Sequence, residues 1–267
     1  MCDSPGPTRQ WRVPEIADST RRFRLDDKVV LLTGASSGLG AQWTVTLAGA
    51  GAKMVVTARR AEALAAIAET VGAVAIPGDL MSEDHRERLV ADTLDRHGRI
   101  DVLINNAGTA ASAPAVDTTL DDFRDMIEAD LASVFALTQS VGAAMIAAGR
   151  GSIINIASLG AERALDRYPL VAYNAAKAGV VAMTRSLAAE WGRLGVRVNA
   201  VGPAFFPTRL SGFLEDPEQV AWIERHSALG RAGRIDELDG AILFLASDAS
   251  SYVTGQHLLV DGGWSVY

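Results

Sequence analysis

The fold is decided by the stretch Lys28-Val29-Val30-Leu31-Leu32-Thr33-Gly34-Ala35-Ser36-Ser37-Gly38-Leu39-Gly40. Its first six residues form a short apolar, β-branched run, which predicts a buried strand. The glycines lie between this run and a helical pattern that continues through Ala50, so a turn joins strand to helix. Such a turn exposes backbone N–H groups at a helix N-terminus, where the helix dipole favours a pyrophosphate. The spacing is not that of the G-x-G-x-x-G fingerprint, so the stretch alone is also consistent with a tight turn that binds nothing.

Strands and helices alternate along the rest of the chain. Further strands are expected at residues 53–58, 73–77, 101–105, 151–157, 196–201 and 257–260. Helices are expected at residues 61–71, 82–97, 120–148 and 235–246, in the segment that carries Tyr173, and as a helical excursion within 209–228. This alternation predicts right-handed βαβ units and a parallel sheet. Ligands of such a sheet bind beyond the carboxyl ends of its strands, where Gly34, Arg59, Asp79 and Asn106 fall.

Two arginines, Arg59 and Arg60, follow the second expected strand. In a dinucleotide site this strand end faces the adenosine ribose, where a carboxylate binds a free 2′-hydroxyl and an arginine suits a 2′-phosphate. Because Arg59 occupies the position and no carboxylate is at hand, we expect NADP rather than NAD, with Ser36 and Ser37 as further hydroxyl donors. The alternative for both arginines is the solvated start of the next helix.

A phenol and an ammonium, Tyr173 and Lys177, lie four residues apart and therefore share one face of a helix. A nearby positive charge favours the phenolate and lowers the pKa of a tyrosine. Tyr173 is therefore a candidate proton donor or acceptor near neutral pH. Tyr-x-x-x-Lys is common by chance, so this pattern indicates an active site only together with the strand-end residues upstream.

The composition sets the class of protein. The chain has 267 residues, 49% of them hydrophobic, and a net charge of −7, which fits one large α/β domain and argues against a nucleic-acid binder. The single cysteine, Cys2, excludes an internal disulfide, and we expect a cytoplasmic protein with no metal site and no membrane contact. No apolar run approaches the roughly 20 residues of a spanning helix. Residues 1–24 are polar and are expected to form an extension outside a domain at 25–267.

From about Leu25 to Gly263 the chain resembles the short-chain dehydrogenase/reductase family. The motifs that carry the resemblance appear in family order: Thr33-Gly34-x-x-x-Gly38-x-Gly40, Asp79, Asn105-Asn106-Ala107-Gly108, Ser158, Tyr173-x-x-x-Lys177 and Asn199-x-x-x-Pro203. Their joint occurrence is far more specific than any single motif. The resemblance implies a single Rossmann-like, doubly wound α/β domain. It also implies a nicotinamide cofactor and hydride exchange between that cofactor and an alcohol or ketone carbon.

The same resemblance implies roles by position. Tyr173 would give a proton to the carbonyl oxygen, or take one in oxidation. Lys177 would hold the nicotinamide ribose and depress the pKa of the tyrosine, and Ser158 would hydrogen-bond the reacting oxygen. Asp79 would meet the adenine, Asn106 the adenosine ribose and Thr208 the nicotinamide amide. The expected cofactor contacts are Gly34, Ser36, Ser37, Gly38, Leu39, Gly40, Arg59, Asp79, Leu80, Asn106, Ala107, Gly108, Tyr173, Lys177, Pro203, Phe206 and Thr208.

The chain departs from the family pattern in the long helix, where the usual asparagine of the proton relay is Asp130. A carboxylate there stabilises Lys177 as a cation while it opposes the phenolate of Tyr173. These effects have opposite signs on the tyrosine, and the sequence leaves the balance open. We expect activity to survive with a shifted pH optimum.

Two further departures lie around the substrate. Gly202-Pro203-Ala204 replaces the usual proline-glycine after the sixth strand, which adds a β-carbon beside the nicotinamide. The loop between Ser158 and Tyr173 is about two residues longer than usual in the family. This loop carries four charged residues, from which we expect a polar substrate entrance: Glu162, Arg163, Asp166 and Arg167.

The substrate is the least readable feature, because it is set by loops. Within the substrate loop at about 204–228, apolar side chains form a possible pocket or lid: Phe205, Phe206, Leu210, Phe213, Leu214 and Trp222. This lid favours NADP-dependent reduction of a moderately apolar ketone or 3-oxoacyl group. One alternative is an NAD-dependent dehydrogenase of a sugar acid or polyol, which would use the charged loop. Another is a dinucleotide-binding sensor without chemistry.

A homo-oligomer, tetramer or dimer, is expected from the family. Apolar residues on the long helix are compatible with that interface and with ordinary core packing alike: Val134, Leu137, Val141 and Met145. The tail from Leu258 to Tyr267 is the second expected contact region.

Overall fold

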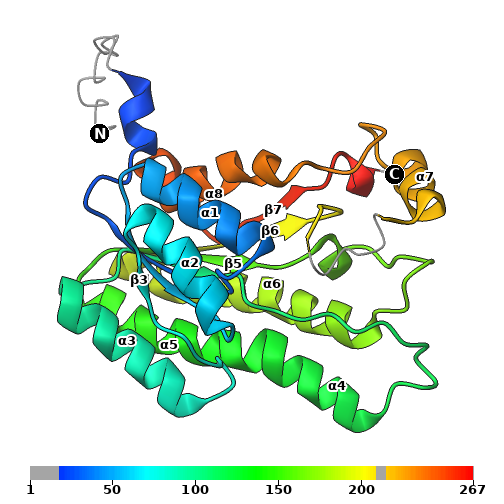
Figure 1. Ribbon diagram of the computed structural model, residues 1–267, viewed down its shortest axis with the longest axis horizontal. Helices are drawn as coiled ribbons and strands as arrows, with labels where there is room; N and C mark the ends of the chain where they lie inside the picture. The colour runs from blue at the N-terminus through cyan, green and yellow to red at the C-terminus, as the bar shows by residue number, and fades with distance from the viewer. Residues whose placement is uncertain (1–17, 209–214, 267) are drawn as a thin grey trace, which may run out of the picture.

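The computed structural model describes residues 18–208 and 215–266, and a parallel sheet forms its centre (Figure 1). The strands are β1 (Val29–Thr33), β2 (Lys53–Thr57), β3 (Val74–Ala75), β4 (Val102–Asn105), β5 (Gly151–Ile156), β6 (Val196–Pro203) and β7 (His257–Val260), in the order β3-β2-β1-β4-β5-β6-β7. All six pairings are parallel. The strand order reverses direction between β1 and β4, which is where ligands of doubly wound sheets bind.

Helices cover both faces of the sheet. They are α1 (Gly38–Gly49), α2 (Ala61–Val71), α3 (Glu83–His97), α4 (Leu120–Ile127), α5 (Ser133–Ala147), α6 (Val171–Trp191), α7 (Pro217–His226) and α8 (Asp239–Ala246). Helix α1 contacts α2 and α8 on one side, whereas α5 contacts α3 and α6 on the other (Figure 1). The predicted single Rossmann-like domain with a doubly wound parallel sheet is confirmed for the described residues.

The strands are apolar along their whole length because both faces are covered. In β1, Val30 and Leu32 belong to the core beneath α1 and α8, whereas Val29 and Leu31 belong to the core beneath α3, α5 and α6. All four side chains are at most 2% exposed. This double burial fixes the position of β1, and with it the glycine-rich turn that follows.

Several elements differ in length from the sequence prediction. The third strand keeps two residues of the expected five, and the sixth runs on to Pro203 because Gly202 and Pro203 pair with Leu259 and Val260 of β7. The segment 235–246 begins as a 3-10 turn and becomes α8 at Asp239. The long helix is not regular: one π-helical turn, Glu128–Ala132, separates α4 from α5.

The continuous helical segment Leu120–Ala147 has a mean hydropathy of 1.4 over its most apolar window and is long enough to cross a membrane by length and composition. The expectation of no such segment was therefore wrong on these two criteria. The segment nevertheless lies against the sheet, and the four apolar residues named above as a possible interface are at most 7% exposed. Their apolarity is accounted for by core packing, and the oligomeric state and the cytoplasmic location stay predictions.

Candidate active site

The glycine-rich turn has the geometry of a phosphate cradle. Gly34 and Gly38 have φ angles of 69° and 56°, a region that suits glycine. A Cβ at Gly40 would lie 2.3 Å from the Gly34 carbonyl oxygen, so only glycine allows α1 to start this close to the turn. The residue before α1, Ser37, makes no side-chain capping bond. The first N–H groups of α1 therefore lack that partner, and the residues fit a dinucleotide pyrophosphate.

The segment after β4 is bonded to this turn. The Asn106 side-chain amide donates to the carbonyl oxygens of Thr33 and Gly34 at 2.9 and 3.2 Å. The Thr33 hydroxyl accepts from the backbone N–H groups of Asn106 and Ala107 at 3.0 and 2.9 Å. The amide of Asn106 thus holds the cradle, and its contact with the adenosine ribose stays a prediction.

The loop after β6 also approaches the glycine-rich turn. A Cβ at Gly38 would lie 3.5 Å from the Cβ of Thr208. The structure therefore brings together two cofactor candidates that are 170 residues apart in the chain. Residues 209–214, which include the predicted lid residues Leu210, Phe213 and Leu214, lie outside the described residues.

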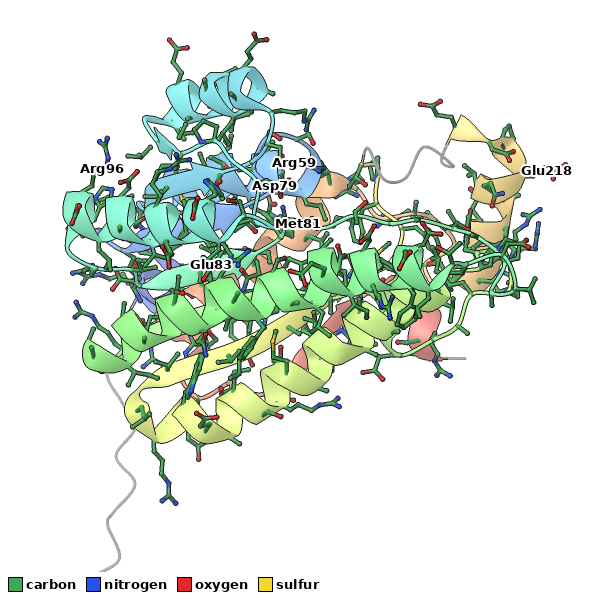
Figure 2. The ribbon with its side chains drawn as sticks, turned by 90° about the horizontal axis from the view of Figure 1, so that it is seen from below. Arg59, Asp79, Met81, Glu83, Arg96 and Glu218 are labelled. Carbon is green, nitrogen blue, oxygen red and sulfur yellow. The ribbon has the colours of Figure 1, made fainter. Side chains whose placement is uncertain are left out.

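The edge formed by the ends of β2 and β3 carries Arg59, which is predicted to bind a 2′-phosphate, and Asp79, which is predicted to meet the adenine. The Gly78 backbone N–H donates to the Ala58 carbonyl oxygen at 3.1 Å, which brings the two loops together. Figure 2 shows Arg59 and Asp79 close to each other at this edge. The Asp79 carboxylate accepts from the backbone N–H of Met81 at 3.0 Å, so it also supports its own turn.

A second arginine at this edge, Arg60, escaped the sequence analysis as a cofactor candidate. Its guanidinium donates to the hydroxyls of Ser36 and Ser37 at 3.0 and 2.5 Å. It therefore reaches across the glycine-rich turn beside the exposed side chain of Arg59. The only sequence signal for this contact was the adjacency of the two arginines after β2.

Helix α6 carries Tyr173 and Lys177 on one face. Lys177 Nζ lies 5.6 Å from the centroid of the Tyr173 ring, which confirms that they are neighbours. The Lys177 side chain is buried and donates to the Ile156 carbonyl oxygen at 3.1 Å, at the end of β5. The ammonium is thereby held at the carboxyl edge of the sheet, between the tyrosine and the end of a strand.

Asp130 faces the same ammonium from the π-helical turn. Its Oδ2 lies 3.0 Å from Lys177 Nζ, and its Oδ1 accepts from the Thr109 backbone N–H at 2.9 Å. The residue has no exposed surface. Burial acts to lower the pKa of Lys177, but the charges of Asp130 and Tyr173 outweigh it and leave the pKa of the ammonium above its usual value.

Ser158 stands immediately after β5 and caps the short 3-10 turn Leu159–Ala161. Its hydroxyl oxygen accepts from the Gly160 backbone N–H at 3.0 Å. Because that oxygen is occupied as an acceptor, its own hydrogen can be donated to another oxygen. The bond to Gly160 therefore leaves the Ser158 hydrogen available, and its donation to a reacting carbonyl oxygen stays a prediction.

A buried polar chain fixes the two strands behind these residues. The Asn105 amide donates to the Thr138 hydroxyl and to Asn155 Oδ1, each at 2.8 Å. The Asn155 amide in turn donates to the Thr184 hydroxyl at 2.9 Å. This chain crosses from α5 through β4 and β5 to α6. The role of Asn155 could not be predicted from the sequence, because one asparagine in an apolar strand has no recognisable spacing.

Aromatic side chains form a buried cluster, here called the aromatic wall, that packs on Leu159, the residue after Ser158. Phe205, Trp222 and Trp264 pack with Leu159 and Tyr168 in one cluster. Trp264 lies 4.8 Å, centroid to centroid, from both Phe205 and Trp222. The wall thus combines the loop after β6, α7 and the last turn of the chain. Trp264 was not predicted as part of it.

Three of the four charges in the long loop after Ser158 are bound to other segments. Glu162 accepts from His257 Nδ1 at 2.9 Å, and Arg163 donates to the Ser265 carbonyl oxygen at 2.6 Å. Arg167 donates to the backbone of Glu218 on α7, which Figure 2 shows well away from Arg59. These three side chains fasten the loop to β7, the last turn and α7. All four charged side chains of the loop are nevertheless exposed, and the polar entrance stays a prediction.

Comparison with known proteins agrees with this geometry. A family model described as enoyl-(acyl carrier protein) reductase matches residues 34–265. D-threitol dehydrogenase of Mycolicibacterium smegmatis is 38% identical over 254 residues, which cover 91% of this chain and 95% of that enzyme. The 3-oxoacyl-[acyl-carrier-protein] reductase of a Synechocystis species is 36% identical over 250 residues, which cover 91% of this chain and 99% of that enzyme.

A solved structure gives the same result. The gluconate 5-dehydrogenase from Burkholderia cenocepacia, in complex with NADP and tartrate, superposes with a TM-score of 0.88 at 36% identity. The match covers 93% of this chain and 99% of that one. With the family model spanning most of the chain and relatives matching nearly end to end, the protein belongs to the short-chain dehydrogenase/reductase family, oxidoreductases of CH–OH and C=O groups.

Proposed function

We propose that the protein is an NADP(H)-dependent reductase of moderately apolar ketones. The observation that carries the proposal is the convergence of a phosphate cradle, two arginines and the Tyr173–Lys177 pair along one edge of the sheet. When bound, NADPH would supply a hydride to the carbonyl carbon. The residues of this chain would bind the cofactor, orient the ketone and move the proton.

The proton is assigned to Tyr173. A phenol can donate to the carbonyl oxygen as negative charge develops there, and the Ser158 hydroxyl would donate a hydrogen bond to the same oxygen. The Lys177 ammonium has three hydrogens. One faces the Ile156 carbonyl oxygen and a second faces Asp130. The third would hold the nicotinamide ribose.

The arginines support NADP over NAD. Arg59 and Arg60 flank the place where a 2′-phosphate would lie, and Ser36 and Ser37 supply hydroxyls beside them. The gluconate 5-dehydrogenase of similar structure contains NADP. A doubly charged phosphate between two guanidinium groups would gain charge-assisted hydrogen bonds that a ribose hydroxyl cannot offer.

We expect Arg59→Asp to reverse the cofactor preference. Losing a charge-assisted bond and adding a repelling carboxylate should lower kcat/KM for NADPH roughly 10- to 100-fold, while NADH is unaffected or improved. Arg60→Ser should lower kcat/KM for NADPH alone. Arg96→Ser, an exposed arginine on α3 (Figure 2), is the matched control. If the ratio of kcat/KM for NADPH to kcat/KM for NADH is the same in all three variants as in the wild type, these arginines do not bind a 2′-phosphate.

The substrate assignment rests on the wall beside Ser158. The buried aromatic cluster packs on Leu159, next to Ser158, and makes this part of the molecule apolar, while the charges at Glu162, Arg163 and Arg167 are engaged in holding the loop. A sugar acid would need free cationic or hydroxyl groups at this place. The relatives include a polyol dehydrogenase, a sugar-acid dehydrogenase and a 3-oxoacyl reductase, so relatedness alone does not choose among them.

The test is a matched panel of carbonyl substrates. NADPH and NADH oxidation would be followed with an alkyl methyl ketone, an aryl ketone, a 3-oxoacyl thioester and a keto sugar acid. We expect the highest kcat/KM for an apolar ketone or the thioester with NADPH. A keto sugar acid with the highest kcat/KM would overturn the assignment in favour of the sugar-acid alternative. Tight NADPH binding with no turnover anywhere on the panel would favour the sensor alternative.

A further inference from the structure

We propose that Asp130 is a positioning residue that neutralises Lys177 and so keeps Tyr173 in its proton-donating phenol form over a wider pH range. The proposal deepens the ketone-reductase function and rests on it for its consequence in turnover. Asp130 has two opposite effects on the pKa of Tyr173, and the proposal is that the opposition to the phenolate prevails.

The contacts make Asp130 part of the site. Its Oδ1 is held by the Thr109 backbone N–H at 2.9 Å, which fixes the carboxylate. Its Oδ2 is fully buried, lies 3.0 Å from Lys177 Nζ and meets no other donor among residues 18–208 and 215–266. A Cβ at Gly108 would lie 3.0 Å from Oδ2 and 3.3 Å from Nζ. The glycine therefore lets the backbone close over the pair and leaves little space for water.

The backbone of the long helix presents the carboxylate. Asp130 lies in the π-helical turn Glu128–Ala132, where one extra residue bulges out of the α-helical register. The following residues return to the regular helix α5 at Ser133. Turns of this kind re-aim a side chain locally, and the one here carries the only fully buried carboxylate among the described residues.

The negative charge of Asp130 decides the sign of the effect on the pKa of Tyr173. A lone ammonium beside Tyr173 would favour the phenolate and lower the pKa of the tyrosine. A buried carboxylate 3.0 Å from that ammonium makes the pair neutral and opposes the field of the ammonium at the phenol. The phenol is the form that donates a proton in ketone reduction. Asp130 therefore extends reduction toward higher pH and restricts alcohol oxidation, which needs the phenolate.

Other charged groups do not compete for this role. Among the described residues, the ionisable groups that raise the pKa of Lys177 are Asp130 and Tyr173. Helix α5 carries no charged residue. The charged residues of the remaining elements that pack on α6, and of α6 itself, are exposed or half-buried: Asp121, Asp122, Arg124, Asp125, Glu128, Glu162, Arg185, Glu190, Arg193 and Arg197.

The test is a direct titration of Tyr173 that needs neither cofactor nor substrate. The chain has four tyrosines, so the phenolate absorbance of Tyr173 would be isolated by subtracting the titration of Tyr173→Phe. We expect Asp130→Asn to lower the midpoint of Tyr173 by about one pH unit. The Asn side chain keeps an oxygen for the Thr109 N–H. Glu128→Gln removes an exposed carboxylate from the same turn and should leave the midpoint unchanged.

Turnover provides the second readout. For any ketone of the panel that is reduced, the pH at which kcat/KM falls on the alkaline side should be lower in Asp130→Asn by the same amount. That pH should not change in Glu128→Gln. Asp130→Ser removes the charge without adding volume and serves if the Asn variant does not fold. An unchanged midpoint would mean that the carboxylate has no electrostatic effect on Tyr173. A raised midpoint would mean that Lys177 has lost its proton. Either result overturns the proposal, and neither depends on which substrate is correct.

Discussion

Tyr173→Phe is expected to lower kcat for ketone reduction roughly 10²- to 10⁴-fold, the usual contribution of a positioned general acid. The substitution removes one oxygen and keeps the ring that lies 5.6 Å from Lys177 Nζ. The cradle and the arginines that would hold the cofactor are not touched. The dissociation constant for NADPH, measured by fluorescence titration, should therefore stay within about twofold.

Tyr168→Phe is the matched control, because Tyr168 is a second phenol five residues before Tyr173. Its hydroxyl donates to Gln219 Oε1 at 2.5 Å, and its ring packs in the aromatic cluster. Burial raises the pKa of Tyr168, and no lysine follows four residues later. We expect this variant to keep kcat within about tenfold. Comparable losses in both variants would remove Tyr173 from its assigned role.

Lys177→Met is expected to have the largest effect on stability. It leaves the Asp130 carboxylate buried without its cation, a change that typically costs roughly 3–5 kcal/mol in free energy of unfolding. Because the folded-state pKa of Lys177 is raised, the stabilisation is complete below the ordinary lysine pKa and is lost only as pH rises through the folded value. Urea unfolding near pH 7 therefore measures the whole effect.

The double variant Lys177→Met/Asp130→Asn separates stability from chemistry. Neutralising Asp130 removes the unpaired buried charge, so most of the lost free energy of unfolding should return. Activity should not return, because the ammonium that would hold the ribose beside Tyr173 is still absent. Recovery of ketone reduction in the double variant would show that Lys177 acts only through folding.

The sequence predicted those parts of the site whose residues lie close to one another in the chain. The glycine-rich turn and the Tyr173–Lys177 pair each lie within eight residues, and a strand-to-helix turn or one helix face fixes their geometry. Asp130 was recognised by its position, but its distance from Lys177 depends on a π-helical turn that no residue pattern announced.

Contacts between distant segments could not be predicted in this way. The bonds of Glu162, Arg163 and Arg167 could not be predicted, because their partners lie 95, 102 and 51 residues away in the chain. Trp264 joins the aromatic wall only through tertiary packing. The extra length of β6 likewise follows from pairing with β7, a strand that begins more than fifty residues later. A single sequence contains no record of such partners.

The central claim is that this edge of the sheet transfers hydride from NADPH to a ketone carbon. The most direct measurement is reduction of an apolar ketone by NADPH deuterated at the transferable position of nicotinamide C4, with mass spectrometry of the alcohol. We predict one deuterium on the carbinol carbon, no incorporation at that carbon when the label is in the solvent, and no labelled alcohol with Tyr173→Phe. An alcohol without deuterium, or labelled alcohol formed equally well by Tyr173→Phe, would contradict the account.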